Sequence, residues 1–317
     1  MYRKDAIVVG EWIRNSNKAL LVTGARQTGK TWLIRDEIEK SGYTKFELNF
    51  IDQPDMVSYL NAEMSAEDFL IKLKMIMPED CKSHETVVFF DEIQKCPEIV
   101  TKIKFLVDEG SFKYVMSGSL LGVELKGIAS APVGYLTVLK MYPMDFEEFM
   151  MANNVSVTTL DMLNEKFKNA SPVDEFVHQK LLSMFFVYLI VGGMPDAVKT
   201  YIETKDIREV DKVQRDITTL YKEDFSQYEI EDRKLKLKSI YDIIPAELNK
   251  QNKKFVFTML DKELKFDRYE NSFLWLKDAG VALPVYNIEA PVIPLLASKS
   301  SNIFRLFSSD IGLLTSA

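Results

Sequence analysis

Short apolar runs alternate with amphipathic stretches along the first half of the chain. A run of four to eight apolar residues bounded by turn residues indicates a buried strand, whereas apolar residues spaced three or four apart indicate a helix. Alternation of the two is typical of a parallel sheet covered by helices, an α/β fold. The pattern predicts strands at 18–24, 46–52, 86–92, 114–119 and 135–143, and helices at 31–42, 66–77, 97–110 and 145–153.

The second half is mostly helical as far as residue 228. It contains the apolar stretch LLSMFFVYLIVGGMP at 181–195, which predicts a buried helix followed by a tight turn. A cofactor-binding glycine pair at Gly192 and Gly193 is the alternative, but such a site requires a preceding strand, and none is predicted there.

A charged stretch at 222–234 marks a predicted domain boundary. Beyond it, three helical patterns precede two strand-like ones, which is the order of elements in a winged helix-turn-helix. The C-terminal part is therefore predicted to be winged-helix-like. The helical patterns lie at 236–249, 255–264 and 267–280, and the strand-like ones at 281–294 and 302–312.

Composition narrows the class of protein. Of the 317 residues, 47% are hydrophobic, enough for more than one core, yet no apolar run approaches the roughly 18 residues of a membrane span. The first residues also lack the apolar centre of a secretory signal, so we expect a cytoplasmic protein that enters no membrane. Two cysteines and two histidines are too few for a cysteine-rich zinc site.

The charge is acidic overall but unevenly distributed. A net charge of -7 and a pI near 5.2 argue against a protein coated with basic surface for nucleic acid. Between Arg233 and Arg268, however, ten Lys and Arg residues accompany five Asp and Glu residues. The DNA-binding alternative therefore places its contacts in this basic block.

Residues 24–31 match the phosphate-loop pattern of two glycines, a lysine and a threonine between a predicted strand and a predicted helix. The glycines let backbone N–H groups and the helix N-terminus approach an anion. The lysine adds a positive charge at the β- and γ-phosphates, and the threonine hydroxyl suits Mg²⁺. The predicted nucleotide-binding residues are Gly24, Ala25, Arg26, Gln27, Thr28, Gly29, Lys30, Thr31 and Trp32.

Two carboxylates, Asp91 and Glu92, end the apolar strand that begins at residue 86. The carboxyl ends of parallel strands form the edge at which such sheets bind ligands. We therefore predict that Asp91, with Thr31, serves Mg²⁺ and that Glu92 is the catalytic group that activates the water attacking the γ-phosphate. A solvated acidic turn is the alternative.

Two further candidate catalytic residues, Ser117 and Ser119, end the next strand. Their hydroxyls suit a hydrogen bond to the γ-phosphate or to the attacking water, but turn chemistry explains the two serines equally well. With this strand between the phosphate-loop strand and the Asp91 strand, the sheet has the order 5-1-4-3-2, that of NTPases with an additional strand and a catalytic glutamate. We predict this order.

Together these residues resemble AAA-superfamily P-loop ATPases of bacteria and archaea whose C-terminal part is a domain of unknown function. The resemblance implies ATP and Mg²⁺ as ligands, assembly into a homo-oligomer, and an ATPase core, a helical lid and a winged-helix domain, which we place at 1–153, 154–230 and 231–317. The similar stretches, from residue 20 to 314, are GARQTGKT, FFDEIQ with Gln94, MSGSLLG, YPMDFEEF, GGMPDAV and IFRLFSSDIGLL.

The chain departs from this family in lacking the arginine that usually precedes YPMDFEEF. The segment Pro132-Val133-Gly134-Tyr135 stands there instead, and no arginine occurs between Asp36 and Ile207. A planar cation for the transition state must come from elsewhere, so we expect turnover that is slow or depends on a neighbouring subunit. Arg215 is a candidate nucleotide sensor and alternatively an ordinary surface residue. The other candidates are Arg208, Lys126 and Lys140.

The C-terminal end is the second departure. Relatives commonly continue beyond the aspartate-glycine-leucine-leucine motif into a nuclease-like domain, whereas this chain stops at Ala317. Nuclease activity is therefore not predicted. The segment DIGLL at 310–314 is expected to lie at an edge of the fold.

Three functions remain open from the sequence. The first is an Mg²⁺-dependent ATPase that moves its lid and winged-helix domain. The second is a DNA-binding regulator for which ATP is only a conformational ligand, and the third is an interaction protein with a degenerate nucleotide site, which the intact motifs disfavour. The predicted DNA-phosphate contacts of the regulator are Lys250, Lys253, Lys254, Lys262, Lys265 and Arg268.

Overall fold

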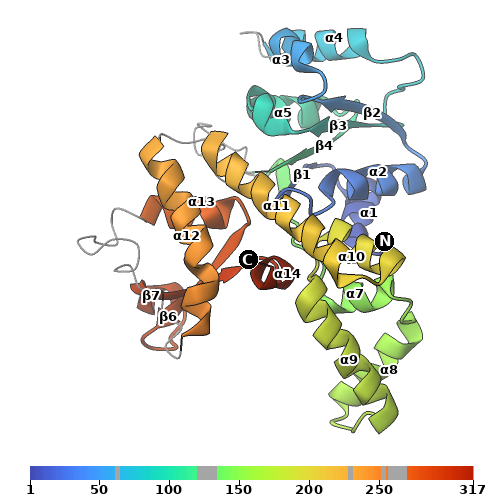
Figure 1. Cartoon of the computed structure of the whole chain (residues 1–317). Helices are drawn as coiled ribbons and strands as arrows, with labels where there is room; N and C mark the ends of the chain where they lie inside the picture. The colour runs from blue at the N-terminus through green and yellow to red at the C-terminus, as the bar shows by residue number, and fades with distance from the viewer. Residues whose placement is uncertain (61–64, 120–133, 228–230, 251–254, 256–269, 317) are drawn as a thin grey trace. The chain divides into compact units, whose positions relative to one another are not determined.

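The computed structural model describes residues 1–60, 65–119, 134–227, 231–250, 255 and 270–316 (Figure 1). The chain divides into two compact units. One is Arg3–Tyr142, and the other is Pro143–Ala317 together with Met1–Tyr2. The division into three domains that the sequence suggests stays a prediction.

The first unit contains five strands and the helices that connect them. Each predicted strand is present, with bounds that differ by a few residues from those predicted. The strands are β1 (Ala19–Thr23), β2 (Thr44–Asn49), β3 (Thr86–Asp91), β4 (Lys113–Gly118) and β5 (Leu136–Lys140). The helices are α1 (Asp5–Asn15), α2 (Lys30–Ser41), α3 (Pro54–Leu60), α4 (Ala66–Ile76), the 3-10 helix η1 (Ile93–Lys95) and α5 (Glu98–Glu109).

The strands form one parallel sheet in the order β2-β3-β4-β1-β5. Read from the other edge this is 5-1-4-3-2, so the predicted order is confirmed. β4 lies between the strand that enters the glycine loop and the strand that ends in Asp91. Its register pairs Ser117 with Val22 of β1 and Met116 with Phe90 of β3, which brings polar residues of three strands to one edge.

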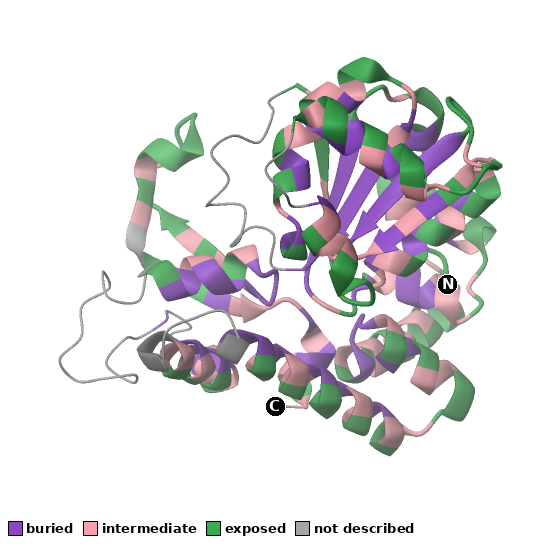
Figure 2. Cartoon of the chain, turned by 90° about the horizontal axis from the view of Figure 1, so that it is seen from above, coloured by how far each residue is buried: buried purple, intermediate pink, exposed green. Residues whose placement is uncertain are grey.

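Helices cover both faces of this sheet and create two cores. Strand residues alternate between the cores: Leu21 and Phe90 pack with α3, α4 and α5, whereas Val22 and Phe89 pack with α1 and α2. Because every residue of β3 is buried, the strand reads as an unbroken apolar run in the sequence. Figure 2 shows the strands of the sheet largely in the colour of buried residues.

The second unit is mostly helical and contains one antiparallel strand pair, β6 with β7. The two predicted C-terminal strands are thereby confirmed, whereas most of the predicted helix at 255–264 lies outside the described residues. Pro245 lies inside α12. The elements are α7 (Phe146–Ala152), α8 (Val157–Lys168), α9 (Glu175–Val191), α10 (Pro195–Thr204), α11 (Ile207–Gln227), α12 (Glu231–Asn249), α13 (Glu270–Asp278), β6 (Ala282–Ile288), η5 (Leu295–Ser298), β7 (Lys299–Ser308) and α14 (Ile311–Thr315).

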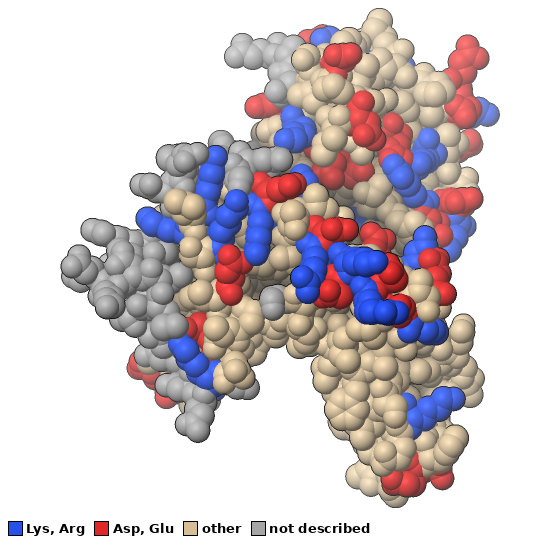
Figure 3. Space-filling model, viewed as in Figure 1, with Lys and Arg blue, Asp and Glu red and all other residues tan. Residues whose placement is uncertain are grey.

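The apolar stretch 181–195 forms most of α9, but the prediction that this helix is buried was wrong. Of the residues of α9 only Val191 is buried, and Phe176 and Phe186 are 77% and 56% exposed. Apolar residues occur on every side of α9, and its contacts with α7, α10, α11 and α14 leave several of them exposed. Figure 3 shows few charged side chains where α8 and α9 lie. None of the described helices is long and apolar enough to cross a bilayer.

The turn after α9 joins several segments of the second unit through Asp310. The Gly193 N–H donates to Asp310 Oδ2 at 2.7 Å, and the Leu313 N–H donates to Oδ1 at 2.9 Å. Side chains are excluded here, because a Cβ at Gly192 would lie 2.3 Å from Asp310 Oδ1 and one at Gly193 would lie 1.9 Å from the Met144 oxygen. The predicted tight turn is confirmed, and its glycines serve packing.

Residues 310–314, which the sequence analysis expects at an edge, are largely buried. Asp310 is 3% exposed and Leu313 is 2% exposed, and α14 packs against α9 and α11. The Gln214 amide donates to the backbone oxygen of Val191 at 2.9 Å and lies where a side chain on Gly312 would have to go. The segment is therefore part of the interior of the second unit.

We predict that Asp310→Ala lowers the free energy of unfolding by about 3 kcal/mol. The substitution removes the helix cap of α14 and leaves the buried Gly193 N–H without an acceptor, and each loss costs about 1 to 2 kcal/mol. The control is Asp174→Ala, which removes an exposed helix cap at α9 and is expected to cost about 1 kcal/mol. Chemical denaturation followed by circular dichroism compares the two, and equal losses would contradict the role of Asp310 in the interior.

Candidate functional site

The loop after β1 requires both of its glycines. At Gly24 the φ angle is +147°, and a Cβ there would lie 2.2 Å from the backbone oxygen of Met141. At Gly29, directly before α2, φ is +89° and ψ is +20°, in the left-handed region that glycine adopts without strain. The helix then begins at Lys30, and its first N–H groups, which have no partner within the helix, are available to an anion.

The Lys30 ammonium lies inside the loop. Its Nζ donates to the backbone oxygens of Gly24 at 3.1 Å and Ala25 at 2.7 Å, and the residue is 8% exposed. Burial lowers the pKa of Lys30 to about 8, although the charges of Glu92 and Asp91 act to raise it. The lysine is therefore a buried cation whose protonation is sensitive to a neighbouring negative charge.

Arg3 contacts the same loop and was missed in the sequence. Its Nη1 donates to the Thr28 oxygen at 2.9 Å and its Nη2 to the Tyr142 oxygen at 2.6 Å, with 4% of the residue exposed. The Thr28 hydroxyl in turn donates to the Ala25 oxygen at 3.0 Å. Arg3 thus ties the loop to the segment after β5, although a single basic residue near the N-terminus carries no sequence signal for this role.

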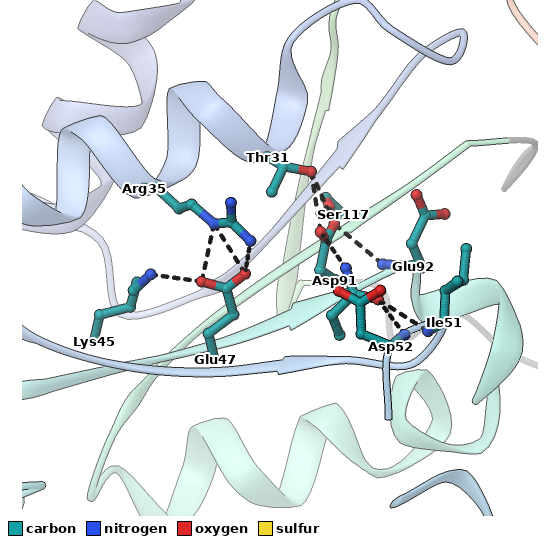
Figure 4. A network of polar contacts seen from close by, with 10 residues as sticks. Thr31, Arg35, Lys45, Glu47, Ile51, Asp52, Asp91, Glu92 and Ser117 are labelled. Atoms are coloured by element: carbon teal, nitrogen blue, oxygen red, sulfur yellow. Dashed lines mark hydrogen bonds and ion pairs between the residues drawn. The ribbon is translucent and has the colours of Figure 1, made fainter. Parts of the chain in front are cut away.

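Asp91 is the centre of a network of polar contacts at the carboxyl edge of the sheet (Figure 4). The carboxylate accepts hydrogen bonds from the Thr31 hydroxyl at 3.0 and 3.2 Å and from the Asn49 amide at 3.2 Å. The Ser117 hydroxyl and the Glu92 N–H also donate to it. With 3% of the residue exposed, Asp91 is not part of a solvated acidic turn.

Thr31 and Asp91 bring a hydroxyl and a carboxylate together, as predicted for a metal site. Hard oxygen donors in small number suit Mg²⁺, which usually keeps several waters. Among the residues that the structure describes, no group of three or more His, Cys, Asp or Glu side chains is placed to hold a metal ion. The donor set therefore fits Mg²⁺ shared with a phosphate ligand.

Glu92 lies beside Asp91 but has different surroundings. Its backbone adopts φ +55° and ψ +46°, a left-handed conformation that is uncommon outside glycine. The Gln94 amide donates to Glu92 Oε2 and lies 3.5 Å from the Ser119 hydroxyl. The structure thus groups Ser117 with Asp91 and Ser119 with Glu92, so both serines belong to the polar network.

The other predicted nucleotide-binding residues lie in or beside the loop. Ala25 and Thr28 are buried, Arg26 is half-buried, Gln27 is exposed with φ +62°, and Trp32 is 48% exposed. Their positions alone do not show which of these residues contact a ligand, so their roles stay predictions.

Three of the four candidate cations are among the described residues. Arg215, on α11 in the second unit, donates to Asp211 at 2.8 Å with 69% of its side chain exposed, and Arg208 pairs with Asp206. Lys140 Nζ lies 5.2 Å from the centre of the Tyr142 ring. Lys126 lies outside the described residues.

The predicted DNA contacts are mostly outside the described part of the chain. Lys250 is described, and its ammonium donates to Glu247, so that its charge is partly neutralised. The remaining predicted contacts outside the described residues are Lys253, Lys254, Lys262, Lys265 and Arg268.

Asn49 is a further residue of the network that sequence reasoning missed. Its amide donates to Asp91, and its Oδ1 accepts from the N–H groups of Ile51 at 2.9 Å and Asp52 at 3.1 Å. A polar residue at the carboxyl end of a strand was a usable signal, since the predicted strand order makes β2 the neighbour of the Asp91 strand.

Comparisons with known proteins agree with this geometry. Residues 16–150 match the family model described as an AAA domain, and residues 183–317 match a domain of unknown function. The uncharacterized protein MJ1544 of Methanocaldococcus jannaschii is 26% identical over 194 residues, which are 61% of this chain and 38% of that protein. The chain thus matches well under half of the length of this relative.

A solved structure shares the fold. The Walker-type ATPase PABY2304 of Pyrococcus abyssi superposes with a TM-score of 0.55 at 12% identity, over 99% of this chain and 94% of that one. Together with the parallel sheet in the order β2-β3-β4-β1-β5, the family matches confirm the resemblance seen in the sequence. Residues 16–150 are thus similar to an AAA domain and have the fold of P-loop ATPases, and residues 183–317, which follow, are similar to a domain of unknown function.

Proposed function

We propose that the chain binds ATP with Mg²⁺ at the loop 24–31 and hydrolyses it. The observation that carries this proposal is the contact between the Thr31 hydroxyl and the buried Asp91 carboxylate, directly beside Lys30 in the glycine loop. A loop built only for packing has no need of a buried lysine or of a buried carboxylate with four polar donors. Both are expected where phosphates and a divalent cation bind.

The loop residues bind and orient the triphosphate. Backbone N–H groups of the loop and of the first turn of α2 donate to phosphate oxygens. Lys30 exchanges its two backbone acceptors, the oxygens of Gly24 and Ala25, for β- and γ-phosphate oxygens. Thr31 and Asp91 would hold Mg²⁺, which would supply positive charge against the phosphates.

Glu92 supplies the general base. Its carboxylate takes a proton from the water that attacks the γ-phosphate, the new phosphorus–oxygen bond forms, and the bond to the β-phosphate oxygen breaks to release ADP. Ser119 donates a hydrogen bond to the γ-phosphate or to the water, and Ser117 acts through the hydrogen bond that its hydroxyl donates to Asp91. The two acids thus have different roles, Asp91 at the metal and Glu92 at the water. This agrees with their different burial and hydrogen-bond partners.

The transition state also needs a planar cation, and two described arginines of the first unit are bonded to other groups. Arg3 is bonded to Thr28 and Tyr142, and Arg35 is paired with Glu47. We infer that Arg215 or a neighbouring subunit of a homo-oligomer supplies it, so that turnover is slow in the isolated chain. Hydrolysis then drives movement of the helical lid and of the winged-helix-like domain.

We predict different losses for two substitutions at this site. Lys30→Ala is expected to weaken ATP binding by about a hundredfold, since a desolvated cation–phosphate contact is worth several kcal/mol. Glu92→Gln is expected to retain ATP affinity and to lower kcat by about a hundredfold or more. ATP binding and phosphate release are measured on both variants, with the exposed Glu39→Gln on α2 as the charge-matched control. Undiminished hydrolysis in both variants would refute the proposed function.

We also predict that ATP affinity falls as the pH rises through about 8. Lys30 has a pKa of about 8, so its ammonium is present below this pH and is lost above it, and phosphates favour the charged form. Affinity should therefore decrease by up to about tenfold per pH unit above the pKa. Titration calorimetry between pH 7 and 9.5 measures both the affinity and the proton uptake. Lys30→Arg, whose guanidinium stays protonated, should show no such decrease, and a parallel decrease in this variant contradicts the assignment.

A further inference from the structure

The backbone at Glu92 does not by itself fix where its carboxylate lies. β3 ends at Asp91 and η1 begins at Ile93, so Glu92 belongs to no regular element. Its left-handed φ of +55° turns the chain sharply at the edge of the sheet. A general base must be held within hydrogen-bond reach of its water, and this restraint has to come from a neighbouring side chain.

Gln94 is that neighbour. Its Nε2 donates to Glu92 Oε2, and the same nitrogen lies 3.5 Å from the Ser119 hydroxyl. Only 7% of Gln94 is exposed, so its position is set by packing. Gln94 therefore links the Glu92 carboxylate, after the end of β3, to Ser119, after the end of β4.

The orientation of the amide follows from its partners. A carboxylate accepts hydrogen bonds and cannot donate one when ionised, so the NH₂ group of Gln94, rather than its oxygen, faces Glu92. The Gln94 Oε1 is buried and has no hydrogen-bond partner among the described residues. A buried carbonyl oxygen without a donor is costly, and a water held between Gln94 and Glu92 would satisfy it.

We infer that Gln94 is a positioning residue for hydrolysis, an inference that rests on the proposed function. Its amide nitrogen holds the Glu92 carboxylate in position, and its oxygen accepts one hydrogen of the attacking water. Glu92 takes the other hydrogen as a proton while the water oxygen bonds to the γ-phosphorus and ADP leaves. Gln94 therefore governs the rate of the chemical step and not the binding of ATP.

The test is the isosteric substitution Gln94→Glu. It replaces the donor with a second carboxylate beside Glu92, and two carboxylates sharing a site cannot both ionise easily, which raises the apparent pKa of the pair. Steady-state ATP hydrolysis is measured from pH 5.5 to 9. We expect kcat at pH 7 to fall about tenfold, the acidic limb of the pH profile to move up by about one unit, and KM for ATP to stay unchanged.

The matched control is Gln179→Glu. Gln179 also donates to a glutamate, Glu175 at 2.8 Å, but on the exposed surface of α9, and this variant is expected to keep the kcat, KM and pH profile of the unsubstituted protein. Gln94→Asn, which keeps the amide but is one methylene shorter, should retain the pH profile while lowering kcat. A purely structural role of Gln94 would not move the acidic limb.

A second readout does not depend on turnover. In Gln94→Glu the two carboxylates share a proton at low pH, so the variant is relatively most stable there and loses stability as the pH rises through the raised pKa of the pair. Its melting temperature, relative to that of the unsubstituted protein, should therefore decrease between pH 5 and pH 8. The same difference for Gln179→Glu should stay nearly constant.

The outcomes separate the inference from the proposed function. If Glu92→Gln is inactive while Gln94→Glu keeps the normal kcat and acidic limb, the inference on Gln94 is wrong and the ATPase assignment stands. Loss of ATP binding in Gln94→Glu also overturns the inference, since it indicates a structural role. If Glu92→Gln hydrolyses ATP normally, the proposed function fails, and a pH-independent difference in melting temperature then shows that Gln94 does not hold Glu92 either.

Discussion

The proposed nucleotide site depends on keeping one buried carboxylate, that of Asp91, supplied with hydrogen-bond donors. Removing a carboxylate from water costs several kcal/mol unless donors replace the lost hydration. At Asp91 the donors are the Thr31 hydroxyl, the Asn49 amide, the Ser117 hydroxyl and the Glu92 N–H. They come from α2, β2, β4 and the turn after β3, so four separate segments must be placed correctly before the carboxylate can be buried.

The strand order is what makes this arrangement possible. β4 separates β1 from β3, and its register places Ser117 beside Val22, at the edge where β3 ends in Asp91. Because side chains alternate along a strand, a shift of one residue would turn the Ser117 hydroxyl to the opposite face of the sheet. The fold and the site therefore depend on the same strand register. This register places the apolar residues in the two cores and also aligns the polar residues at the strand ends.

The sequence predicted those parts of this arrangement that a local pattern of residues encodes. β3 was predictable because burial on both faces leaves an unbroken apolar run, and the glycine loop because its spacing is itself the signal. Arg3 was missed because its contacts, with Thr28 and Tyr142, join segments far apart in the sequence. Asn49 was missed although its place at the end of a strand was a usable signal for its contact with Asp91. α9 shows the opposite error: its apolar composition suggested burial, but burial depends on which elements cover a helix, and no local pattern contains that information.

The stretches that resemble AAA-superfamily ATPases have different physical causes in the two units. Those of the first unit supply charged and polar groups, as at Lys30 and Asp91. Those of the second unit enclose Asp310, where the Gly193 N–H meets the carboxylate and no side chain fits at Gly192 or Gly312. Because this carboxylate is also buried, desolvation raises its pKa even though backbone N–H groups act to lower it. Each unit thus contains a buried acid that accepts several hydrogen bonds, and the acid of the first unit lies beside the glycine loop.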